Sequence, residues 1–191
     1  MLEDKSTFID SKEVFQSVID GYSNGYLVAH NHFFDMRVLG NNGINVKNHN
    51  WLCTWRMAKK LFADIDSIEE TNLPYLRFAL DLNVPLEMLC HRAGNDSYIT
   101  AKLLEIMIDL IEENNIIDTS KSYGPQILEW INKPIIYTKM PFGKYKGELM
   151  TDVPKSYWRW ALTNMDSLNE KADNFDLDFA ASVHRALGLD E

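Results

Sequence analysis

The sequence has few cysteines and no long apolar run, and these absences exclude several classes of protein. Its two cysteines, Cys53 and Cys90, lack the closely spaced Cys or His partners of a zinc site and are too few for a disulfide framework, so we expect two buried, reduced thiols. The longest apolar stretch, 103–111, is interrupted by acidic residues, and no segment approaches the roughly 20 apolar residues of a membrane helix. A signal-peptide pattern is also lacking at the start, which favours a cytoplasmic protein.

Positive charge is also scarce. Nineteen lysines and arginines face 28 acidic residues, and the net charge of −9 excludes a protein that coats nucleic acid non-specifically. A local basic patch, or a metal held by carboxylates, remains compatible with this charge. The hydrophobic share of 46% over 191 residues is that of a globular protein, with one domain or a large domain plus a small one.

Hydrophobic spacing in the first two thirds of the chain predicts an α/β arrangement. Short apolar runs indicate buried strands at 26–30 and 51–54, each followed by a helical pattern. The expected helices are 11–22, 33–39, 55–62, 75–82 and a long one at 95–114.

The pattern weakens after this long helix, where turn signals surround a short helix at 126–131. Glycines and aromatics at 140–147 then favour a hairpin, followed by an amphipathic segment at 157–162 and a last helix at 170–187. We therefore expect a first domain over 1–116, a linker over 117–138 and a small α+β module over 139–191.

Asp35 is the first candidate for chemistry, because it lies in the first turn of a helix directly after a buried strand. A carboxylate there is held at the carboxyl end of the sheet, where open α/β sheets bind ligands. Alternatively, Asp35 only favours the positive end of its helix.

His91 and Asp96 form the second candidate group, at the start of the long helix. The carboxylate can hold a metal while the imidazole takes a proton from water. The alternative is a helix-start residue and a solvated loop histidine.

Together the two groups resemble two motifs of the DEDDh (DnaQ-like) 3′–5′ exonuclease family. The second motif of that family is a strand, His-Asn, two variable residues, Phe-Asp and a helix, and residues 30–35 read His-Asn-His-Phe-Phe-Asp. The third motif, His followed five residues later by Asp, matches His91 and Asp96. The segments 51–61 and 142–160 are similar to the exodeoxyribonuclease X group and its small carboxyl-terminal extension.

The resemblance implies a ribonuclease H-like fold and hydrolysis of single-stranded DNA from its 3′ end with two Mg²⁺ or Mn²⁺ ions. Asp35 and Asp96 would be metal ligands and His91 the general base. His30, Asn31 and Phe34 would contact the nucleic acid.

One departure from the family is clear: its first motif, Asp-x-Glu, occurs nowhere in the chain. The chain resembles a nuclease without its first strands and without two metal-binding carboxylates. We therefore expect little or no exonuclease activity from this chain alone. We also expect a partner, either a separate amino-terminal fragment or a second copy, to cover the strand at 26–30. A catalytically dead remnant that binds nucleic acid or protein is the alternative.

The segment from Lys139 to Arg159 is basic within an acidic chain, with five cations and two acids. Lysines at the tip of the expected hairpin suit phosphates, and an aromatic ring suits stacked bases. We expect Lys144, Tyr145 and Lys146 to contact nucleic acid. Most of the aromatics at 157, 158 and 160 are expected in the core of the module instead.

Overall fold

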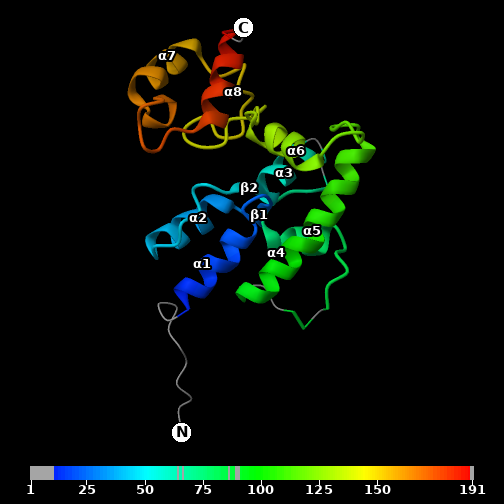
Figure 1. Ribbon diagram of the computed structural model, residues 1–191. Helices are drawn as coiled ribbons and strands as arrows, with labels where there is room; N and C mark the ends of the chain where they lie inside the picture. Colours follow the sequence, from blue (N-terminus) through cyan, green and yellow to red (C-terminus); the bar gives the residue numbers. More distant parts are fainter. Residues whose placement is uncertain (1–10, 64, 66, 86, 89–90, 190–191) are drawn as a thin grey trace. The chain divides into compact units, whose positions relative to one another are not determined.

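The computed structural model describes residues 11–63, 65, 67–85, 87–88 and 91–189, and the chain divides into two compact units. Unit 1 comprises Met1–Asn132 and unit 2 comprises Lys133–Glu191. Figure 1 shows the elements of both units in chain order. Each unit contains its own hydrophobic core.

Unit 1 is built on two parallel strands. β1 (Tyr26–Ala29) pairs with β2 (Asn50–Cys53) in a register that places Tyr26 opposite Asn50 and Ala29 opposite Cys53. Parallel strands need a long crossover, and here the connection contains α2 (His32–Asn41). Within the described residues, β2 is the only strand paired with β1, so the second edge of β1 carries no ladder.

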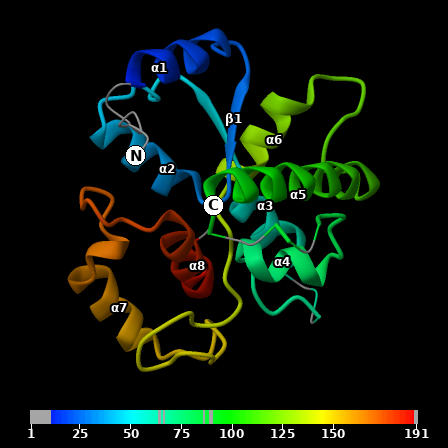
Figure 2. The ribbon, with the colours of Figure 1, turned by 90° about the horizontal axis from the view of Figure 1, so that it is seen from below.

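Alternation along the strands supplies two apolar faces. Leu27, Ala29 and Trp51 belong to a small cluster with Ile19 of α1 (Lys12–Gly21). Val28 and Leu52 belong to the larger core on the opposite face. That face is covered by α3 (Thr54–Leu61), α4 (Leu73–Ala79), α5 (Ala93–Glu113) and α6 (Tyr123–Asn132). In Figure 2, α1 and α2 lie to one side of β1 while α5 crosses it.

The mixture of helices and a small parallel sheet agrees with the expected α/β class. Helix and strand bounds in unit 1 fall within a few residues of the expected ones. One difference concerns 117–138, which we expected as a linker. Here α6 buries Ile127 and Ile131 in the unit 1 core, so the boundary between units lies after Asn132.

Two further expectations from the sequence have structural counterparts. Cys53 is a fully buried free thiol, whereas Cys90 lies outside the described residues. None of the helices in the described ranges is long and apolar enough to cross a membrane.

Unit 2 packs two helices and a loop around a compact core. The elements are α7 (Lys155–Asn164), the 3₁₀ helix η1 (Asp166–Leu168) and α8 (Leu177–Leu187). Trp158 and Phe179 are nearly or fully buried, with ring centres 6.2 Å apart. The expected hairpin at 140–147 forms only a single antiparallel bridge, between Lys139 and Leu149, and no strand element occurs in the described part of unit 2.

The last helix starts later than the expected range of 170–187. Asp176 accepts a hydrogen bond from the backbone N–H of Phe179 at 3.0 Å and so caps α8, which begins at Leu177. The preceding run, 170–176, is polar and offers no continuous apolar face, and turns replace helix there.

Two buried polar side chains of α8 hold the chain that enters unit 2. The carboxylate of Asp178 accepts the N–H of Ile135 at 2.9 Å, and the hydroxyl of Ser182 accepts the N–H of Tyr137 at 2.8 Å. Because buried donors need partners, these bonds fix an otherwise irregular segment.

Replacing Asp178 with alanine should lower the free energy of unfolding by about 1–3 kcal/mol, since the buried N–H of Ile135 loses its acceptor. Asp178→Asn, which keeps an acceptor oxygen, should lose less. Urea unfolding followed by circular dichroism measures both, with the exposed Asp173→Ala as the control. Equal stability of Asp178→Ala and the control would show that this bond does not hold the segment.

Candidate functional site

A cavity of about 700 Å³ opens at the carboxyl end of β1. It brings together the two groups of candidate residues, which are far apart in sequence. The lining residues are Val28, Ala29, His30, Asn31, Phe34, Asp35, Leu73, Pro74, His91, Ala93, Asp96, Ser97, Thr100, Ala101 and Leu104. All six candidates from residues 30–35 and 91–96 are therefore in one place.

His30 joins the ends of the two strands beneath this cavity. Its Nε2 lies 2.9 Å from the carbonyl oxygen of Thr71, and its Nδ1 lies 3.0 Å from the hydroxyl of Thr54. Because a carbonyl only accepts, Nε2 carries the proton, and in the neutral ring Nδ1 accepts from Thr54. Burial lowers the pKa of His30 against the opposing effect of the Thr71 carbonyl, which favours this neutral form.

Strand register explains why Thr54 is the partner. Ala29 and Cys53 are the last paired residues, so the next residues along both strands, His30 and Thr54, face each other. His30 therefore has both ring nitrogens engaged within unit 1.

Three of the lining residues, Asn31, Phe34 and Asp35, lie at the start of α2. Asn31 precedes the helix with φ of 71°, the left-handed region that asparagine tolerates better than most residues. The turn leaves Phe34 55% exposed on the cavity side of the unit, with the guanidinium carbon of Arg37 6.0 Å from its ring centre.

Asp35 is half-buried, and its pKa is raised by burial, while a hydrogen bond with its own backbone opposes the rise. A carboxylate whose ionised form is penalised gains from a nearby cation. Burial therefore disfavours the ionised form of Asp35 in this structure.

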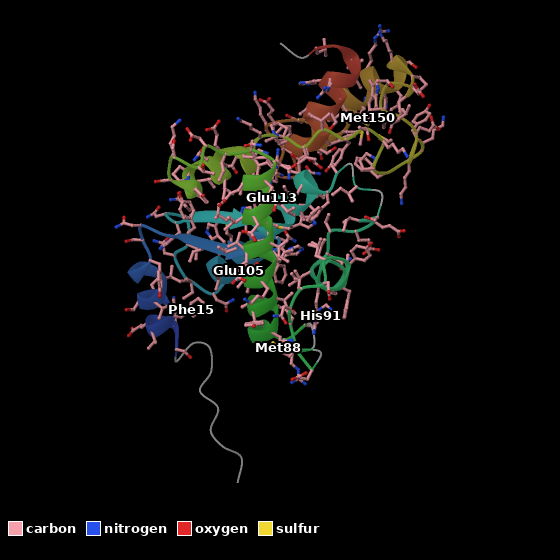
Figure 3. The ribbon with its side chains drawn as sticks, turned by 90° about the vertical axis from the view of Figure 1, so that its right-hand side faces the viewer. Phe15, Met88, His91, Glu105, Glu113 and Met150 are labelled. Carbon is pink, nitrogen blue, oxygen red and sulfur yellow. The ribbon has the colours of Figure 1, made fainter. Side chains whose placement is uncertain are left out.

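The second wall comes from α5 and the loop before it. The carboxylate of Asp96 accepts the backbone N–H of His91 at 3.0 Å, so the acid in the first helical turn also fixes the loop histidine. His91 has φ of 68°, an unusual conformation for this residue type. Figure 3 shows His91 beside the amino-terminal end of α5.

The donor set of the cavity suits one hard cation better than two. Asp35 and Asp96 are the only acidic residues among its lining residues, and the described residues contain no group of three or more His, Cys, Asp or Glu side chains placed to hold a metal. Magnesium commonly binds through one or two carboxylates and keeps several waters. The residues present therefore fit a single, weakly held ion and not a complete two-ion centre.

The remaining candidates, Lys144, Tyr145 and Lys146, lie in unit 2 and do not line this cavity. Trp158 is a core residue and the half-buried Tyr157 packs against the core, as expected for most of these three aromatics, whereas Trp160 is 52% exposed. On α7 the buried face contains Trp158 and Ala161, and Trp160 lies outside that narrow face.

Sequence reasoning missed the supporting residues of the cavity. Thr54 and Thr71 hold His30, and Ser97 and Thr100 line the wall on α5. The sequence signal for these wall residues is helical spacing. Thr100 is four residues after Asp96 and three after Ser97, which places its side chain near both on the same helix.

Comparison with curated proteins shows similarity to a nuclease. The chain is 34% identical over 152 residues to exodeoxyribonuclease 10 of Escherichia coli K12, and equally to that of E. coli O6:H1 strain CFT073. The alignment covers 78% of this chain but only 61% of each relative. This homology supports an exonuclease family.

A family model with the description "Putative quorum-sensing-regulated virulence factor" matches residues 129–164, from the end of α6 through α7. No solved structure matches the chain. The ribonuclease H-like fold therefore remains a prediction.

The left-handed backbone of His91 provides a way to remove the imidazole without damage to the fold. We expect His91→Gly to be about 1 kcal/mol more stable than His91→Ala, because only glycine adopts this conformation without steric cost. Parallel urea titrations of the two variants measure the difference. Greater stability of the alanine variant would contradict the assigned backbone.

Asp35→Asn should stabilise the chain at neutral pH, because it removes a carboxylate whose ionised form is disfavoured by burial. The gain should be only about 0.5 kcal/mol, since Asp35 is partly exposed to solvent and lies at the positive amino-terminal end of α2. The pKa of Asp35 is raised in the folded chain, so between the ordinary and the raised pKa the native state binds more protons than the unfolded state. The free energy of unfolding of the wild type therefore falls as the pH rises through this range. The advantage of Asp35→Asn should therefore vanish in acid, below the ordinary pKa. Unfolding curves at several pH values test this, and an advantage that grows in acid would contradict it.

Proposed function

Starting from the similarity to exodeoxyribonuclease 10, we propose that this chain belongs to the DEDDh exonucleases and that its cavity removes nucleotides from 3′ ends of single-stranded DNA. The observation that carries the proposal is the convergence of Asp35, His91 and Asp96 on one cavity at the carboxyl end of β1. A base and two metal-binding carboxylates are the groups that phosphodiester hydrolysis requires.

The charge of the cavity supports a metal-dependent reaction. Two carboxylates line it, and neither lysine nor arginine is among its lining residues in the described chain. The two carboxylates would repel a phosphate unless a cation lay between the carboxylates and the phosphate. A bound Mg²⁺ or Mn²⁺ would supply that charge and polarise a phosphate oxygen.

The candidate residues of the cavity then have the following roles. Asp35 and Asp96 hold the cation, and His91 takes a proton from the attacking water. Asn31 and Phe34 contact the terminal nucleotide, with the exposed ring of Phe34 available for stacking on a base. His30 acts through its bonds to Thr54 and Thr71, which fix the strand ends beneath these residues.

The chain alone is expected to be a poor catalyst, because two carboxylates hold one ion weakly and a two-ion reaction needs more. The second edge of β1 offers a place for the missing ligands, since a strand added there would end beside the cavity. A separate amino-terminal fragment or a second copy of the chain would supply it.

A catalytically inactive binding protein is the second candidate function. The small donor set favours it, because two carboxylates hold metal too weakly for an efficient two-ion reaction. An incomplete exonuclease should release nucleotides when a fragment supplies the missing carboxylates, whereas an inactive binding protein should not.

Binding of Mn²⁺ tests the metal site directly. We expect Asp35→Asn and Asp96→Asn each to weaken binding by at least about 10-fold, a loss that even indirect partners of a metal can cause. Asp109→Asn, an exposed acid on the same α5 helix outside the cavity, should leave binding unchanged. Calorimetric titration measures the affinities, and equal affinities for all variants would contradict the assigned ligands.

Nucleotide release from a 3′-labelled single-stranded oligonucleotide tests catalysis. With Mn²⁺ the chain alone should release little label, and addition of a fragment carrying an Asp-x-Glu strand should raise release in the wild type but not in His91→Gly. Strong release by the chain alone, lost in His91→Gly, would contradict the incomplete site. DNA binding without release in either case would favour the inactive binding protein.

A further inference from the structure

Three aromatic rings form a row on the surface of unit 2. Tyr145 and Tyr157 are half-buried with ring centres 4.9 Å apart, and Trp160 lies 5.5 Å from Tyr157 and is 52% exposed. Tyr157 and Trp160 are three residues apart on α7, so they share a side of that helix. Tyr145 reaches the row from a separate loop, and two elements thus build one surface.

The loop around Tyr145 is held by its own backbone. The N–H of Met140 donates to the carbonyl of Glu148, and the N–H of Gly147 donates to the carbonyl of Met140, both at 2.8 Å. Gly143 and Gly147 have φ of 75° and 87°, which glycine adopts at little cost. These turns bring residues 144–146 to the tip, where Tyr145 packs edge-on against Tyr157.

Exposed cations lie in the same two elements as the aromatic row, the loop and α7. Lys144, Lys146, Lys155 and Arg159 are exposed, and no ion pair joins any of them to a carboxylate in the part of the chain that is described. The Nζ of Lys144 lies 5.1 Å from the ring centre of Tyr145.

We propose that Tyr145, Tyr157 and Trp160, with Lys144, Lys146 and Arg159, bind single-stranded nucleic acid. A base stacks on the exposed ring of Trp160, beside the half-buried Tyr157 and Tyr145, while the cations contact phosphates, a combination that tolerates any sequence. Duplex bases are already stacked on one another, so this surface discriminates in favour of single strands. The surface lies in unit 2 and needs no metal, so this inference goes beyond the proposed exonuclease function.

The core of unit 2 does not account for Trp160. Trp158 and Phe179 fill that core with relative exposures of 1% and 0%. A lone exposed aromatic needs no explanation. Here Trp160 is one of three neighbouring rings, and exposed cations lie in the same loop and helix.

Trp160→Ala tests the stacking surface. Fluorescence anisotropy with labelled oligo(dT), in EDTA at 100 mM salt, should show affinity reduced about 5- to 100-fold, the loss expected for one stacked base. Trp160→Phe should recover most of the affinity. Leu177→Ala, which truncates a side chain 46% exposed on α8, is the matched control and should bind like the wild type.

The double variant Lys144→Ala/Lys146→Ala tests the phosphate contacts. The slope of log K against log salt concentration should fall by about 1.4, since each single-strand phosphate contact contributes about 0.7. Lys171→Ala, an exposed lysine in the acidic part of the same unit, should leave the slope unchanged. Trp160→Ala should weaken binding without changing the slope.

Unchanged affinity of Trp160→Ala would overturn the proposal, as would equal binding of a duplex. If light scattering then showed that Trp160→Ala dissociates an oligomer, the row would be a protein-docking surface instead. Parallel titrations with oligo(rU) distinguish RNA from DNA as the strand that is bound. Because EDTA prevents hydrolysis, a loss of binding here is separate from any failure of the nuclease assay.

Discussion

The parallel register of β1 and β2 is the constraint on which the cavity depends. It places His30 against Thr54 at the point where both strands end, and the half-buried imidazole then reaches Thr71. With the strand ends fixed in this way, the chain turns through Asn31 into α2 and presents Asp35 at the carboxyl end of the sheet. A shift of one residue in this register would turn the side chains of β1 to the opposite face and break the His30 bonds.

The opposite wall is positioned by helix packing. α5 is held by a buried row of Ile99, Leu103, Met107 and Ile111, which recurs at helical spacing and packs in the unit 1 core. Its first turn therefore arrives at a fixed place, and Asp96 uses that place to bind the backbone of His91. Strand pairing determines one wall and helix packing the other, and the cavity lies where they meet.

The sequence predicted much of unit 1 because its elements are long or strongly patterned. The strands at 26–29 and 50–53 and the α5 helix follow from apolar periodicity, and the two site groups follow from position at element ends. The sequence did not predict that α6 joins unit 1, because Ile127 and Ile131 make up only a short apolar pattern. It also overestimated α8, since the polar cap at Asp176 was not recognised. The sequence did not show which of the aromatics at 157, 158 and 160 is exposed, because apolarity does not reveal which side of a short helix is covered.

The order of the elements along the chain has a consequence for synthesis. The strand pair, α2 and the residues that accept from or donate to His30 all precede residue 72, whereas α5 begins at Ala93. One wall of the cavity, with Asp35, therefore leaves the ribosome before the segment that carries Asp96. Until α5 emerges and packs, the apolar face of β1 has no cover from it, and the nascent chain is most exposed to chaperones and to association with other chains during that interval.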